Sequence, residues 1–205
     1  GETLAHIIQE VKDYIAAHPH EHVDFLLASG PVGVMAATNE AVDQAEVVML
    51  ILLFASISLL CFAEFRSVAA VLCIVVPLAI VAVLCNALMA TLGIGLKVST
   101  LPVVALGVGV GVDYGIYLFE RMKHALADGL SLQDAFHKAL QQRGTAAIFT
   151  AITMSISVGT WAFSALKFQA DMGILLAFLF MVNMLGAIFV LPALAAWLVK
   201  GKKKA

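Results

Sequence analysis

Five long apolar runs, separated by short polar connections, dominate the sequence from residue 46 onward. A helix needs about 20 apolar residues, within a range of roughly 17 to 25, to cross the hydrocarbon core of a bilayer. Hydrophobic residues make up 62% of the 205 residues and charged residues 13%, whereas soluble domains average about half apolar and a quarter charged. The sequence therefore predicts an all-α integral membrane fold with five transmembrane helices. The predicted spans cover residues 47–63, 68–92, 98–119, 146–166 and 172–199.

Two prolines, Pro77 and Pro102, fall inside the second and third predicted spans. Neighbouring helices can satisfy the carbonyl groups that a proline leaves free, so both are compatible with spanning helices. The three cysteines, Cys61, Cys73 and Cys85, also lie in apolar runs and have no CxxC spacing. We expect buried, small hydrophobic side chains at these positions, not disulfides or metal ligands.

Basic residues in the connections indicate how the spans are oriented. Nine of them lie in alternate connections and the C-terminal tail, against three on the other side. Because cytoplasmic connections are enriched in Lys and Arg, we expect residues 121–143 and the tail at 200–205 to be cytoplasmic and the N-terminal segment to be periplasmic. The nine are Arg66, Arg121, Lys123, Lys138, Arg143, Lys200, Lys202, Lys203 and Lys204, and the three are Lys12, Lys97 and Lys167.

Residues 1–45 differ in kind from the rest. Apolar residues at helical spacing predict an amphipathic helix over 3–17. A short strand is predicted over 22–29, a turn at Gly30-Pro31, and a second helix that continues into the first span. Helix–strand–helix is too small to bury a core of its own. We therefore expect the C-terminal remnant of an α+β extracytoplasmic, porter-like domain, and a chain that is a fragment of a longer polypeptide.

Three alternating histidines, His18, His20 and His22, form the sequence HPHEH. A metal site is one interpretation of this pattern. A solvated loop around a proline is favoured by its composition, and we expect no metal there.

The connection at 121–143 contains a predicted amphipathic helix. Ser131 with Asp134 three residues later resembles a capping box, with Asp in place of the usual Glu or Gln. We expect this helix to lie along the inner leaflet surface. A coupling role between spans is the alternative to this structural role.

The third predicted span contains an acid, Asp113, within the stretch GVGVGVDYGIY. A charged acid near the middle of a bilayer costs on the order of 3 kcal/mol or more. Such residues usually carry protons, bind ions or pair with another charge. A structural Asp that is hydrogen-bonded to a neighbouring hydroxyl is the alternative.

The same span has two contrasting faces. Gly107, Gly111 and Gly115 recur every four residues, a pattern that lets a neighbouring helix approach closely. At about 100° per residue, Asp113 lies roughly 160° from this stripe. The acid shares its face with Leu106, Gly109 and Tyr117. We expect a packing face on one side and a buried acid on the other, with space at Gly109 and a phenol at Tyr117.

Hydroxyl side chains gather on one face of the fourth predicted span, within about 80° of arc. They are Thr150, Thr153, Ser157, Thr160 and Ser164. The face is expected to line a hydrated path or to solvate the carboxylate, with Thr150, Thr153 and Ser157 nearest its depth. For Thr160 and Ser164, simple helix packing is equally compatible.

Three stretches resemble the C-terminal half of resistance–nodulation–division (RND) superfamily exporters, and specifically the MMPL-type branch. They are GVGVGVDYGIYLFERM, RGTAAIFT and FQADMGILLAFLFMVNMLGAIFVLPALAAWL. In that family each half consists of one helix, a large periplasmic domain and five further helices. The resemblance implies the end of such a domain at 1–45 and a five-helix membrane domain at 46–199.

The resemblance also implies a function for the acid. Asp113 and Tyr114 match an Asp-Tyr pair that forms half of a proton relay and faces an equivalent pair in the N-terminal half of the transporter. Drug-efflux members carry a Lys in this helix, so Asp113 favours export of lipids or other hydrophobic metabolites. The implied protein is a secondary transporter of the bacterial inner membrane and not an enzyme.

The implied partners are protons, membrane lipids, a hydrophobic substrate and the missing N-terminal half. A homo-oligomer stays open, and we expect no cofactor and no nucleic acid. A lipid- or sterol-sensing module without transport is the alternative function. An accessory protein of protein translocation in the same superfamily fits less well.

Overall fold

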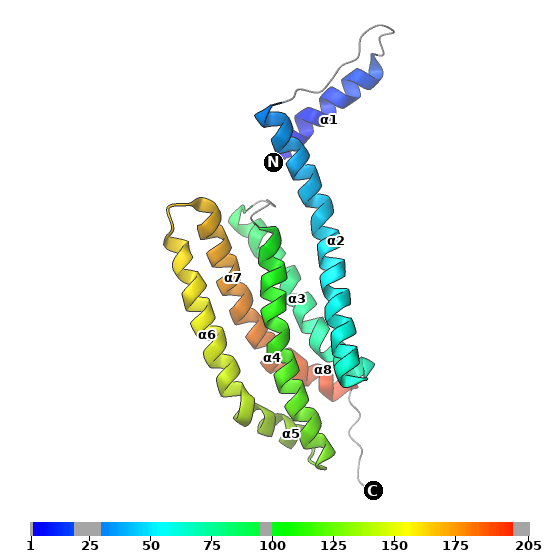
Figure 1. Ribbon diagram of the computed structural model, residues 1–205, viewed down its shortest axis with the longest axis vertical. Helices are drawn as coiled ribbons and strands as arrows, with labels where there is room; N and C mark the ends of the chain where they lie inside the picture. The colour runs from blue at the N-terminus through cyan, green and yellow to red at the C-terminus, as the bar shows by residue number, and fades with distance from the viewer. Residues whose placement is uncertain (1, 19–29, 95–99, 199–205) are drawn as a thin grey trace.

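The computed structural model describes residues 2–18, 30–94 and 100–198. Within these ranges there is no strand, and five helical stretches are long and apolar enough to cross a membrane (Figure 1). These stretches are Ala45–Phe65, Val68–Leu92, Pro102–Ala127, Leu132–Phe163 and Lys167–Leu198. The predicted all-α membrane fold with five spans is confirmed.

The N-terminal segment is helical on both sides of its undescribed part. Helix α1 (Glu2–Ala17) agrees with the predicted amphipathic helix. Helix α2 (Pro31–Phe65) begins after Gly30 and runs without interruption into the first span, as the pattern indicates. The predicted strand at 22–29 and two of the three histidines, His20 and His22, lie outside the described residues.

Three helices form the centre of the bundle, and each packs against the other two: α3 (Val68–Leu92), α4 (Leu101–Ala127) and α7 (Lys167–Leu185). Helix α2 packs against α3 and α4 near its C-terminal end and diverges from them towards its N-terminal end (Figure 1). Helix α6 (Thr145–Gly159) ends in a 3₁₀ turn, η2 (Thr160–Phe163), and packs mainly against α7. Helix α8 (Leu191–Leu198) follows a π-helical turn, η3 (Gly186–Val190), and returns to α3.

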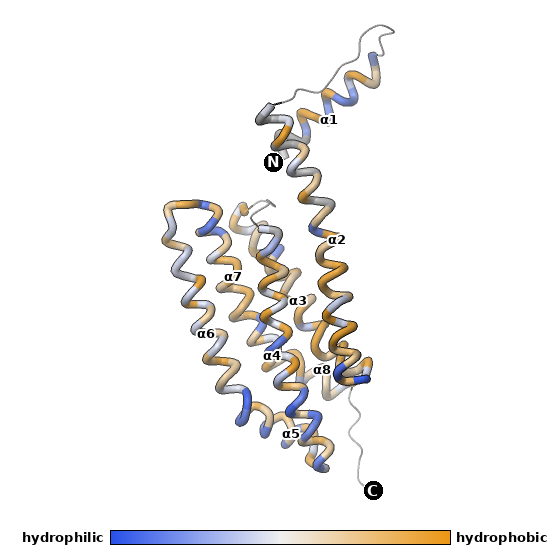
Figure 2. The backbone as a smooth tube through the Cα atoms, viewed as in Figure 1, coloured by the Kyte–Doolittle hydropathy of each residue, from blue (hydrophilic) through white to orange (hydrophobic). Residues whose placement is uncertain are grey.

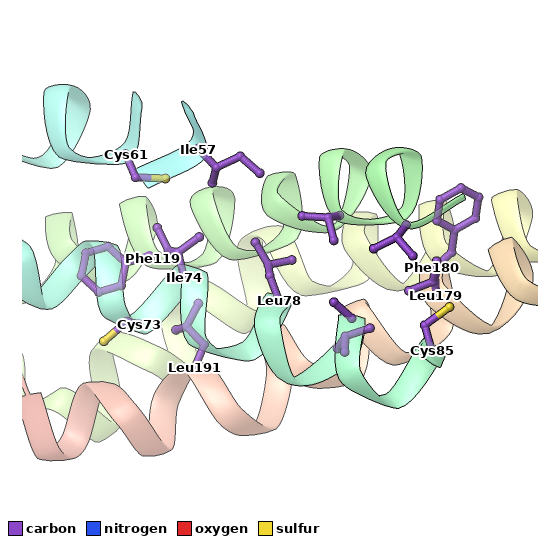
Figure 3. Packing of buried hydrophobic residues seen from close by; sticks show 14 of the residues in the cluster. Ile57, Cys61, Cys73, Ile74, Leu78, Cys85, Phe119, Leu179, Phe180 and Leu191 are labelled. Atoms are coloured by element: carbon purple, nitrogen blue, oxygen red, sulfur yellow. The ribbon is translucent and has the colours of Figure 1, made fainter. Parts of the chain in front are cut away.

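The core between these helices is apolar. Figure 3 shows Ile74 of α3 close to Phe119 of α4 and Leu191 of α8. All three cysteines are free and buried, as the sequence predicts. Their small apolar side chains allow close helix packing.

The two prolines differ in their positions. Pro77 lies inside α3, as predicted, and Gly186 of η3 lies opposite it. Pro102 is the first residue of its span and not an interior one, because α4 begins at Leu101 and places this proline in its first turn. The missing N–H of a proline costs nothing there, since the first helical N–H groups have no partner within the helix.

The connection after α4 folds into the predicted capped helix, α5 (Leu132–Ala139). The Ser131 hydroxyl accepts a hydrogen bond from the Asp134 N–H at 3.2 Å and donates one to the Asp134 carboxylate at 2.6 Å. The buried side chains of Ala135 and Ala139 lie on a helix that packs against α4. Helix α5 continues through a π-helical turn, η1 (Leu140–Gly144), directly into α6, so it is joined to the fourth span without a break.

Polar residues gather at the two ends of the bundle and apolar residues along its length (Figure 2). Arg143 in η1 and Lys167 at the start of α7 lie at opposite ends of the α6 segment, and both are exposed. Under the predicted orientation, Lys167 faces the periplasm and Arg143 the cytoplasm.

Cysteine labelling tests this orientation. In a variant without the three native cysteines, Lys167→Cys should react with an impermeant maleimide in intact cells, and Arg143→Cys should react only after the inner membrane is opened. Modification of both cysteines in intact cells would contradict the orientation.

Candidate functional site

The glycine stripe of α4 lies where this helix meets α7 and α3. A Cβ atom at Gly107 would lie 2.4 Å from Leu179 Cδ1, and one at Gly111 would lie 2.4 Å from Asn183 Cγ. At Gly115 the nearest atom would be Ile74 Cγ2, at 3.2 Å. Contacts under about 3 Å do not occur for real Cβ atoms, so α4 and α7 can approach this closely only because positions 107 and 111 are glycine.

A buried amide links the same two helices. Asn183 of α7 is 3% exposed, and its Nδ2 donates a hydrogen bond to the Gly107 carbonyl oxygen at 2.8 Å. Its Oδ1 has no hydrogen-bond partner among the described residues. The sequence analysis missed Asn183, although it is the one strongly polar side chain between Met172 and Leu198 and a polar residue in a span marks function or helix pairing.

Asp113 lies on the opposite face of α4, and no helix of the described chain covers it. Its own side chain is exposed, and its neighbours on this face, Leu106 and Tyr117, are 52% and 51% exposed. A Cβ atom at Gly109 would have nothing within 4 Å. The expectation of a buried acid is therefore wrong for this chain by itself, because α3 and α7 pack on the glycine face and leave the acid face open.

Tyr114 points into the bundle although it is next to Asp113. It is 3% exposed and packs in a small cluster from α4, α6, α7 and η3. Its hydroxyl has no hydrogen-bond partner among the residues that the structure describes. The Asp-Tyr pair thus projects to two different faces, and Tyr117 is the phenol that shares the face of the acid. The other members of the cluster are Leu118, Ala147, Ala151, Met184 and Ala187.

The hydroxyl stripe of α6 and η2 does not meet Asp113. Thr150, Thr153 and Ser157 are exposed, and within the described ranges no hydrogen bond joins them to the acid. The Thr153 hydroxyl donates to the carbonyl oxygens of Phe149 at 2.9 Å and Thr150 at 3.0 Å, both on its own helix. Hydroxyl groups in membrane helices often bond in this local way.

The outer part of the hydroxyl stripe also bonds locally. The Thr160 hydroxyl donates to the Ser157 carbonyl at 2.7 Å, and the Ser164 hydroxyl to Gln169 Oε1 at 3.1 Å. Ser155, which the sequence analysis missed, is the α6 hydroxyl that bonds across to α7. Its hydroxyl donates to the Ala177 carbonyl at 3.2 Å.

Unlike Asp113, the acid Asp171 near the start of α7 is buried. Asp171 is 9% exposed, and Thr100, next to the start of α4, is 2% exposed. Both residues have an interaction partner. Gly107 faces Leu179 and Gly111 faces Asn183, the same offset of 72 residues, so α4 and α7 run in the same direction. By this register Asp171 lies near the level at which α4 begins. The sequence analysis missed Asp171 because it lies just before the predicted start of the last span.

Residues 2–204 match the profile of the MMPL family. The chain belongs to the MMPL family. Members of this family are transporter-type membrane proteins. The five membrane-spanning helices of the chain agree with this assignment.

Three curated relatives of this MMPL chain are described as membrane proteins. Putative membrane protein MJ1562 of Methanocaldococcus jannaschii is 22% identical over 191 residues, which are 93% of this chain and 49% of that protein. Membrane protein YdfJ of Bacillus subtilis is 22% identical over 98 residues, which are 48% of this chain and 13% of that protein. Putative membrane protein SCO6666 of Streptomyces coelicolor is 28% identical over 89 residues, which are 43% of this chain and 13% of that protein. The MMPL chain thus spans about half or less of the length of these relatives.

Proposed function

We propose that this MMPL chain is the C-terminal half of a transporter that uses the proton motive force to export lipids or other hydrophobic molecules across the inner membrane. Asp113 is the residue that takes up and releases the proton. The observation that carries the proposal is the position of Asp113 on a face of α4 that the described chain leaves uncovered.

A carboxylate that faces lipid is costly, and membrane helices turn such groups towards protein or water. The open face of α4 is therefore suited to pack against another helix bundle. In the proposal, that bundle is the N-terminal half of the transporter. Gly109 leaves room beside Asp113 for a side chain or water of the partner, and Tyr117 offers a hydroxyl one turn further along the same face.

Protonation changes which packing of the two bundles is stable. A neutral Asp113 can enter an apolar contact that a charged carboxylate cannot, so proton uptake from the periplasm favours one arrangement and release to the cytoplasm the other. One charge that crosses a potential of 100 mV supplies about 2.3 kcal/mol, enough to bias such an equilibrium. Tyr114 contributes as a buried hydroxyl that is free to join the relay when the helices move.

Transport in vesicles tests this function. Inside-out inner-membrane vesicles that contain the protein should accumulate a fluorescent phospholipid analogue when a pH gradient is imposed, and nigericin, which collapses the gradient, should stop accumulation. Accumulation that nigericin does not change would contradict proton coupling. Binding of the analogue without any accumulation would indicate a lipid-sensing module instead.

A further inference from the structure

A pocket of about 260 Å³ lies where the ends of several helices meet. It is formed by the C-terminal end of α2, the start of α3, the last turns of α4 and the end of α8. Because these helix ends share one level, the pocket opens at one edge of the apolar part of the bundle and not at its middle. Its walls, as far as the described residues form them, are apolar apart from Lys123 and Ser67. The apolar walls include Phe65, Ala69, Ala70, Phe119 and Leu198.

Among the residues that the structure describes, Lys123 is the only charged one that lines this pocket. Its Nζ lies 3.4 Å from the Phe65 carbonyl oxygen and 5.3 Å from the centroid of the Phe65 ring. The Phe65 ring meets the Phe119 ring edge-on at 5.3 Å, so the apolar wall beneath the ammonium group is well packed. An ammonium group has three donors, and the Phe65 carbonyl uses one of them.

Two other cations near this end of the bundle already have partners. Lys138 lies 3.9 Å from the Asp128 carboxylate, and Arg121 donates to the side chain of Gln142. Lys123 has no such partner: none of the carboxylates in the described ranges forms an ion pair with it. The pocket therefore combines an uncompensated positive charge with an apolar wall.

We propose that this pocket binds the headgroup of an anionic phospholipid from the cytoplasmic leaflet. The phosphate would accept hydrogen bonds from the two remaining Lys123 donors, and the adjoining glycerol carbons would lie against Phe65 and Leu198. Basic pockets between spanning helices on the cytoplasmic side are suited to anionic lipid headgroups. The proposal rests on the predicted orientation and does not depend on the transport function.

The size of the pocket fits a headgroup and not a whole lipid. At about 30 Å³ for one water in the liquid, the volume of about 260 Å³ equals roughly nine waters. The acyl chains must therefore lie outside it, and exposed apolar side chains begin beside the pocket on α2 and α3. They are Phe62, Val68 and Leu72.

Native mass spectrometry of the purified protein tests this site. We compare retention of dioleoyl-phosphatidylglycerol, which is anionic, with that of dioleoyl-phosphatidylcholine, which is zwitterionic. The protein should retain phosphatidylglycerol preferentially, and Lys123→Gln should reduce the preference roughly fivefold, as expected for one lysine at a membrane surface. Lys138→Gln, which removes a paired cation outside the pocket, serves as the matched control and should keep the preference.

Two further measurements separate this site from other sources of binding. Ala69→Leu fills the pocket without changing charge and should also lower phosphatidylglycerol retention, while glycerol 3-phosphate without acyl chains should not compete at equal concentration. An unchanged preference in Lys123→Gln would overturn the proposal. It would also be overturned if neutralising the four tail lysines alone abolished the preference, or if glycerol 3-phosphate competed fully.

Discussion

Replacement of Asp113 by Asn is expected to reduce proton-driven export to background while the protein still inserts and accumulates in the membrane. The amide keeps the shape of the side chain and removes the group that exchanges a proton. Asp113→Glu should retain partial activity or none, because one extra methylene moves the carboxylate within a closely packed interface. Export by each variant is measured in the vesicle assay, with its amount in the membrane measured by immunoblot.

Glu120→Gln provides the matched control for Asp113→Asn. Glu120 is an exposed acid two turns further along α4, and its carboxylate lies 3.9 Å from His124. Removing this charge near the end of the span should leave export close to wild type. Wild-type export by Asp113→Asn under a pH gradient would exclude the proposed proton role.

Replacement of Gly111 by Ala is expected to destabilise the bundle by about 1–3 kcal/mol, the usual cost of overpacking a core. The new Cβ would lie 2.4 Å from Asn183 Cγ and 2.5 Å from Asn183 Nδ2, so α4 and α7 must separate or Asn183 must move. Movement of Asn183 would also break its hydrogen bond to Gly107. The measurement is the midpoint of thermal unfolding in detergent.

Gly109→Ala is the control for Gly111→Ala on the same helix. A Cβ at Gly109 meets nothing within 4 Å, and Ala is favoured over Gly inside a helix by roughly 0.5–1 kcal/mol. This variant should unfold at the same temperature as the wild type or higher. Asn183→Ala should reduce the cost of Gly111→Ala in a double-mutant cycle. Equal midpoints for Gly109→Ala and Gly111→Ala would show that α4 and α7 do not pack as described.

The sequence predicts the elements of this fold well because membrane spans depend on local composition. Each run is apolar over a length that only a helix can satisfy within a bilayer, and the capped helix at Ser131 depends on residues three positions apart. The start of α4 was less predictable. The apolar run begins at Val98, whereas the helix begins at Leu101 with Pro102 in its first turn.

The surroundings of the candidate site could not be derived in the same way. Helical periodicity shows which residues share a face, but not which helix that face meets. The spacing of the glycines separates them from Asp113 on α4, yet it does not reveal that the acid face stays open within this chain. The same limit explains why the hydroxyl stripe of α6 was expected near the acid, whereas α6 packs on α7 and Ser155 is the hydroxyl that bonds across this contact.

Polar residues that lack a motif were also overlooked. Asn183 and Asp171 both lie on α7, whose sequence indicates only an apolar run with a family resemblance. Their burial depends on the close approach of other helices, and for Asn183 this approach depends on Gly107 and Gly111 of α4. Asn183 is an isolated polar residue in its span, as Asp113 is in its own, so the same criterion identifies both.

Infrared difference spectroscopy of the full transporter tests the central claim most directly, because it detects protonation of a single carboxyl group. A pH jump should produce a change in the C=O stretch of a protonated carboxylic acid in the wild-type protein. This change should be absent in Asp113→Asn and should persist in Asp171→Asn and Glu120→Gln. A carboxyl signal of the same size in wild type and Asp113→Asn would show that another group carries the proton and would contradict the account.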